Sequence, residues 1–152
     1  MTGSGLSRAF LDTNVFLTAT DAGRPLRRNA LFALEQWPSQ GVRTYTCTQV
    51  LREYLVVATR PSAAGGLGMA LGDAFSNIDQ FASAVQVLPE TLKTWDQLRV
   101  VLAKSALSGV RIHDANIAAC ALANGISTIL TANVADFGQL PVATVDLASL
   151  LV

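Results

Sequence analysis

Charged residues are scarce in this chain, and their scarcity narrows the classes of protein to consider. They make up 14% of the 152 residues, against roughly 25% in ordinary soluble domains. Apolar residues make up 51%, and the mean hydropathy is +0.39. With 11 acidic and 11 basic residues the net charge is zero, so the chain lacks the basic excess of a general nucleic-acid coat protein. A chain with this apolar composition is expected to cover apolar surface with a permanent partner, either a second copy or another protein.

Cysteine and histidine are equally rare. Cys47 and Cys120 have no paired metal-ligand spacing, so both are interpreted as core residues. His113 is the only histidine, and no Gly-x-Ser-x-Gly segment accompanies it, which leaves no serine-hydrolase signature. We expect His113 at a helix start or at the rim of a site.

Long apolar runs are also missing. A polar residue or glycine interrupts each stretch that might otherwise cross a bilayer, so no membrane association is expected. Residues 1–5 have neither a basic end nor an apolar secretory core, and the protein is therefore expected in the cytoplasm. The length suits one domain, interpreted as a flexible N-terminus at 1–6 followed by a single folded unit at 7–152.

Strand-like and helix-like segments alternate along that unit. Strands are predicted at 7–12, 43–47, 85–88, 127–131 and 142–145, and the helices between them include 48–59, 90–108 and 114–124. Such alternation is typical of an α/β fold with a central, mostly parallel sheet of about five strands flanked by helices. In open sheets of this kind, functional groups collect beyond the carboxyl ends of the strands.

Four of the few acidic residues occupy such places. Asp12 closes the first strand, Glu53 lies in an apolar helix, Asp114 starts another helix, and Asp136 follows the strand that ends at Thr131. Two carboxylates about 5 Å apart repel by roughly 3 kcal/mol at an effective dielectric of 20, so acids gathered there need a cation. Oxygen ligands without a histidine or cysteine cluster favour Mg²⁺ or Mn²⁺.

The segments around these acids resemble the PIN-domain family, with the nearest likeness to VapC-type toxins of bacterial and archaeal toxin–antitoxin pairs. The resemblance lies in four motifs in order, and it spans the chain from Leu11 to about Val145: Leu11-Asp12-Thr13-Asn14-Val15, Gln49-Val50-Leu51-Arg52-Glu53, His113-Asp114-Ala115-Asn116-Ile117-Ala118-Ala119 and Leu130-Thr131-Ala132-Asn133-Val134-Ala135-Asp136-Phe137. It implies a PIN-like nuclease domain, a Mg²⁺- or Mn²⁺-dependent endoribonuclease acting on RNA, a cognate antitoxin and a homodimer.

The resemblance also implies roles for single residues. Asp12, Glu53 and Asp114 correspond to the family's first three acids. Its fourth position is ambiguous here, because Asn133 stands where many members have an acid, whereas Asp136 stands where others have one. We assign the fourth acidic role to Asp136 and keep Asn133 as a polar contact, since an amide oxygen can ligate a metal but carries no charge.

In this scheme Asp12 and Asp114 bind the metal directly, while Glu53 and Asp136 act through water or hold a second ion. Nearby hydroxyl and amide groups would orient the carboxylates or contact phosphate: Thr13, Asn14 and Thr131.

Other interpretations remain open from sequence alone. Each acid could instead be a helix cap, a turn residue or a solvated surface group. An aspartyl phosphatase could use Asp12 as nucleophile, but that chemistry usually wants a second acid two residues later, where Asn14 stands. A non-catalytic PIN-like binding or assembly module, with a site that has decayed at Asn133, is the other rival.

Overall fold

The central sheet has five parallel strands in the order β3-β2-β1-β4-β5. The structure is a computed structural model that describes residues 5–151, so the predicted N-terminal segment 1–6 lies mostly outside the described residues. The strands confirm the predicted fold class: β1 (Arg8–Leu11), β2 (Arg43–Cys47), β3 (Gln86–Leu88), β4 (Thr128–Thr131) and β5 (Ala143–Asp146).

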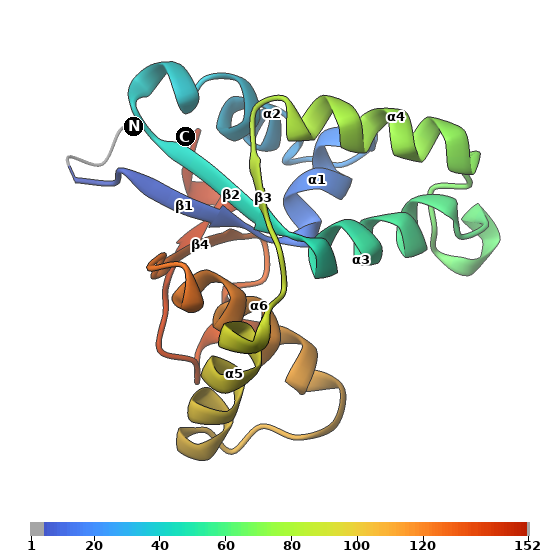
Figure 1. Ribbon diagram of the computed structural model, residues 1–152. Coiled ribbons are helices and arrows are strands. Elements are labelled where there is room, and N and C mark those ends of the chain that lie inside the picture. The colour runs from blue at the N-terminus through green and yellow to red at the C-terminus, as the bar shows by residue number, and fades with distance from the viewer. Residues whose placement is uncertain (1–4, 152) are drawn as a thin grey trace.

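Helices cover both faces of this sheet. Figure 1 shows α5 and α6 together on one side, with α1, α2 and α4 on the other. The bounds are α1 (Thr13–Thr20), α2 (Arg27–Glu35), α3 (Thr48–Thr59), α4 (Leu71–Ala82), α5 (Leu92–Lys104) and α6 (Ile112–Ala123). Between residues 5 and 151, no helix combines the length and the apolar character that crossing a bilayer would require.

The core lies on both faces of the central strands. In β1, Ala9, Phe10 and Leu11 are all fully buried, as a strand covered by helices on both faces requires. Cys47, at the end of β2, and Cys120, in α6, are buried free thiols, which confirms that they fill the core.

The chain changes direction across the sheet at β1. The next two strands, β2 and β3, are added on one side of β1, and β4 then pairs with its other side, with Leu11 opposite Leu130. The backbone N–H of Asp12 donates to the carbonyl of Leu130 at 3.0 Å, so the ends of β1 and β4 stay together. Such a reversal of strand order opens a crevice beyond the carboxyl ends of the two strands.

Two helices have bounds that differ from the sequence prediction. The helix predicted at 90–108 spans 92–104. Thr91 sets its start, because the Thr91 hydroxyl accepts from the N–H of Lys93 and the N–H of Thr91 donates to the Thr94 hydroxyl. The helix predicted from Asp114 begins at Ile112, after a single 3-10 turn, η3 (Gly109–Arg111). Asp114 therefore lies inside the first turn of α6 rather than at its cap.

Tyr54 joins three helices and provides a test of the packing. Its ring is fully buried, and its hydroxyl lies 2.8 Å from the hydroxyl of Thr20 and accepts from the Asn77 amide at 3.1 Å. Replacing Tyr54 by Phe is expected to lower the free energy of unfolding by about 1 kcal/mol, because these groups lose a buried partner. Urea denaturation measures this, with Tyr45→Phe as the control. Equal stability of the two variants would contradict the packing described.

Candidate active site

Asp12 is the most constrained acid in the structure. It follows β1, caps α1 and is only 7% exposed. Its Oδ1 accepts from the N–H of Thr13 at 2.8 Å, and its Oδ2 accepts from the Thr131 hydroxyl at 2.9 Å and the Asn14 amide at 3.1 Å. Burial raises the pKa of Asp12 to about 6 despite the bonds from Thr131 and Thr13, and the nearby Glu53 carboxylate adds to the rise.

Asn14 and Thr131 tie the ends of β1 and β4 together around that carboxylate. The Asn14 amide also donates to the Thr131 hydroxyl at 3.2 Å, while its Oδ1 accepts from the N–H of Ala132 at 3.0 Å. The Thr131 hydroxyl further accepts from the N–H of Asn133 at 3.0 Å. The loop after β4 is thus fixed to the first turn of α1 by side chains, which holds Asp12 from two elements.

Glu53 is joined to Asp12 through one residue, Thr13. The backbone N–H of Thr13 donates to Asp12, and its hydroxyl donates to Glu53 Oε2 at 2.8 Å. Gln49 Nε2 donates to the other oxygen, Oε1, at 2.9 Å. Both oxygens of the Glu53 carboxylate are therefore held by donors from α1 and α3.

Asp114 and Asp136 complete the acidic face. Asp114 is half-buried, and its pKa is raised by burial and then by the carboxylates of Asp136 and Glu53, against the opposing charges of Arg111 and His113. Asp136 lies in a 3-10 turn, η4 (Val134–Phe137), where the Arg111 guanidinium donates to its backbone carbonyl at 3.4 Å. His113 is exposed in the first turn of α6, at the rim.

The two candidates for the fourth acidic position have different surroundings. Asp136 is half-buried and close enough to Asp114 to raise its pKa. Asn133 is exposed, and its hydrogen bond to Thr131 is made by the backbone. These surroundings favour Asp136 as the fourth acid, although its catalytic role stays a prediction.

The donor set suits a hydrated hard cation. Within residues 5–151, no group of three or more Asp, Glu, His or Cys side chains is placed to hold a metal ion together. The acids instead form a row in which Glu53 is near both Asp12 and Asp114, and its charge raises the pKa of each. Mg²⁺ usually keeps several waters and is bound by one or two carboxylates, so an open row of oxygen ligands fits it better than a caged site would.

The sequence interpretation missed a group of side chains behind Glu53. The Gln49 amide donates to Glu53 and, at 3.0 Å, to the carbonyl of His113, and its Oε1 accepts from Asn116 at 2.6 Å. Asn116 also donates to Glu90 at 3.1 Å. Gln49 stands one helical turn before Glu53, a spacing at which side chains meet, and that signal could have identified it.

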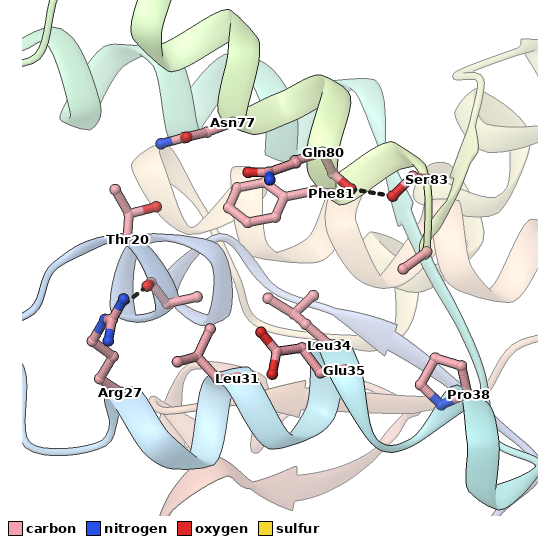
Figure 2. A pocket seen from close by; sticks show the side chains of 12 residues that line it. Thr20, Arg27, Leu31, Leu34, Glu35, Pro38, Asn77, Gln80, Phe81 and Ser83 are labelled. Carbon is pink, nitrogen blue, oxygen red and sulfur yellow. Dashed lines mark hydrogen bonds between the residues drawn. The ribbon is translucent and has the colours of Figure 1, made fainter.

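A separate cavity of about 810 Å³ lies between α1, α2 and α4. Figure 2 shows Arg27 and Glu35 of α2 at one wall and Phe81 of α4 at another, with none of the candidate acids in its lining. The cavity is therefore distinct from the acidic face described above.

Comparisons with known proteins agree with this architecture. Several solved structures resemble the chain at low sequence identity, and three of them serve as examples. VapBC2 of Rickettsia felis bound to a promoter DNA fragment is 19% identical, with a TM-score of 0.67, over 91% of this chain and 98% of that one. A toxin–antitoxin complex of Klebsiella pneumoniae is 22% identical, with a TM-score of 0.63, over 91% of this chain and 97% of that one. VapC20 of Mycobacterium tuberculosis, a Sarcin-Ricin loop cleaving toxin, is 18% identical, with a TM-score of 0.62, over 88% of this chain and 98% of that one.

No curated protein matches the sequence. The PIN domain family model, however, matches residues 9–141, a span that contains all four candidate acids. The match confirms the resemblance inferred from the four motifs, and the chain belongs to the PIN-domain family.

Proposed function

We propose that this protein is an endoribonuclease that hydrolyses RNA phosphodiester bonds with the help of Mg²⁺ or Mn²⁺. The observation that carries the proposal is the Thr13 bridge, which holds the buried Asp12 carboxylate beside Glu53 at the carboxyl edge of the sheet. Burial of an acid whose pKa is raised is unfavourable for the free protein at neutral pH, and a bound cation would relieve it.

The side chains would have different roles according to their positions in the site. Asp12 and Asp114 would hold the ion directly, and Glu53 and Asp136 would bind through water or a second ion. A divalent cation in such a site lowers the pKa of an attacking water and neutralises charge that develops on the phosphoryl oxygens. Thr13, Asn14 and Thr131 keep the Asp12 carboxylate oriented through their hydrogen bonds, and Asn133 is proposed as a polar contact to the substrate.

The nuclease proposal predicts strict metal dependence. The purified protein is expected to cleave a mixture of single-stranded RNAs in Mg²⁺ or Mn²⁺ and to leave them intact in EDTA, because repelling carboxylates cannot orient phosphate without a cation. Electrophoresis and sequencing of the RNA ends measure this, with DNA of the same sequences as the comparison. Binding of Mn²⁺ without cleavage of any RNA would support the non-catalytic binding module instead.

The proposed partners are a cognate antitoxin protein and a second copy of the chain. The Klebsiella pneumoniae structure is a toxin–antitoxin complex by name, and VapC20 is named as a toxin. In this chain Val56 on α3 and Leu71 and Phe75 on α4 are each about half exposed, and these two helices pack together. Exposed apolar side chains on adjoining helices give a protein partner surface to cover.

A further inference from the structure

Gln49 has a polar amide side chain that is almost fully buried. It lies in the first turn of α3, and it is only 1% exposed. Its Nε2 donates to Glu53 Oε1 and to the carbonyl of His113, and its Oε1 accepts from Asn116. Every polar atom of this amide is therefore paired, as burial of such a group requires.

The chemistry of the partners fixes the orientation of the amide. A carboxylate and a backbone carbonyl only accept hydrogen bonds, so the NH₂ group of Gln49 must face Glu53 and His113. Its oxygen then faces Asn116, whose own NH₂ group reaches both Gln49 and Glu90 Oε2. The two amides thus link two carboxylates: Asn116 donates to both Glu90 and Gln49, and Gln49 donates to Glu53. Neither amide can flip without losing bonds.

This chain connects the two halves of the acidic face. Glu53 belongs to α3, whereas the carbonyl of His113 immediately precedes Asp114 in α6. Gln49 touches the Glu53 carboxylate and the α6 backbone at the same time, and its neutral amide adds no charge beside these acids. A carboxylate at position 49 would repel Glu53, and an apolar side chain would lose the hydrogen bonds to Glu53 and to the carbonyl of His113.

We propose that Gln49 is a positioning residue for the nuclease site. It sets the Glu53 carboxylate against the first turn of α6, so that Glu53 and Asp114 face the same substrate phosphate. The inference rests on the proposed function, and it makes Asn116 the support that keeps the Gln49 amide in place. A merely structural role for Gln49 would lower the stability of the fold and leave the chemistry of the folded protein unchanged.

The test measures catalysis and metal binding separately. Gln49→Leu is expected to lower kcat for a fluorescent single-stranded RNA roughly 10- to 100-fold, with KM within about threefold of the unaltered protein, as for other groups that orient metal ligands. Calorimetry with Mn²⁺ and no RNA should show weaker binding. Asn124→Ala is the matched control, because this amide, directly after α6, donates to the carbonyl of Cys120 and touches no acid. It should change neither value.

A second variant covers the case in which Gln49→Leu does not fold. Asn116→Ala removes one support of the Gln49 amide from a half-buried position and should lower kcat by a smaller factor. Folded variants that keep the unaltered kcat and Mn²⁺ affinity would overturn the role of Gln49. If the unaltered protein binds Mn²⁺ and cuts no RNA, the nuclease proposal alone fails, and the Mn²⁺ affinities of the variants still decide the role of Gln49.

Discussion

Replacement of Asp12 by Asn is expected to reduce RNA cleavage more than about 100-fold, beyond the usual loss from an outer-shell partner of a metal site. The variant should stay folded. An Asn oxygen at the place of Oδ2 can still accept from the Thr131 hydroxyl and the Asn14 amide, and only the bond from the N–H of Thr13 is lost. What disappears is the negative charge, which no neighbouring group replaces.

A surface acid provides the control for this variant. Asp79 is exposed on α4, and Asp79→Asn removes the same charge outside the acidic face. Initial rates of RNA cleavage in Mg²⁺, measured with circular dichroism as the check on folding, should separate the two variants. A folded Asp12→Asn protein that cleaves RNA at the rate of Asp79→Asn would refute the placement of Asp12 in the catalytic site.

The stability of the metal-free protein should fall as pH rises from about 4 to about 7. The pKa of Asp12 is about 6 in the folded protein against an ordinary value of 3.8, so the folded state favours the protonated acid. The contribution of Asp12 to the free energy of unfolding is fully present below pH 3.8 and is lost as the pH rises through 6. A pKa that is about two higher in the folded than in the unfolded state corresponds to about 3 kcal/mol in the free energy of unfolding.

Urea unfolding of chelator-treated protein at several pH values measures this contribution. Asp114 also has a raised pKa and acts in the same direction, so the difference between the unaltered protein and Asp12→Asn isolates Asp12. At neutral pH the variant should be the more stable of the two, and added Mn²⁺ should stabilise only the unaltered protein. Stability curves that run parallel across this pH range would contradict the burial of a strained carboxylate at position 12.

The fold and the positions of the first acids were predictable because local signals agreed. Buried strands alternated with helices, and Asp12 directly followed a strand whose last three residues are fully buried. Parallel strands end at one edge, so placing Asp12 near Thr131 required only the strand order. The hydrogen bond between these side chains agrees with that reasoning.

The supporting contacts were harder to predict because they depend on how helices pack. The bonds of Gln49 to His113 and Asn116 join segments more than 60 residues apart, and nothing local in α3 indicates which helix lies beside it. The start of α6 at Ile112 depends on the preceding 3-10 turn, which carries no strong sequence signal. The environment of Asp136 likewise became visible only once Asp114 was placed.

The pairing of β4 with β1 has a consequence for synthesis of the chain. Asp12 leaves the ribosome early, but the Thr131 hydroxyl that orients it comes 119 residues later in the sequence. A growing chain therefore carries its first acid long before the strand that completes its surroundings. For a protein proposed to cut RNA, this order of assembly would keep the nascent polypeptide inactive beside the message and the ribosome that produce it.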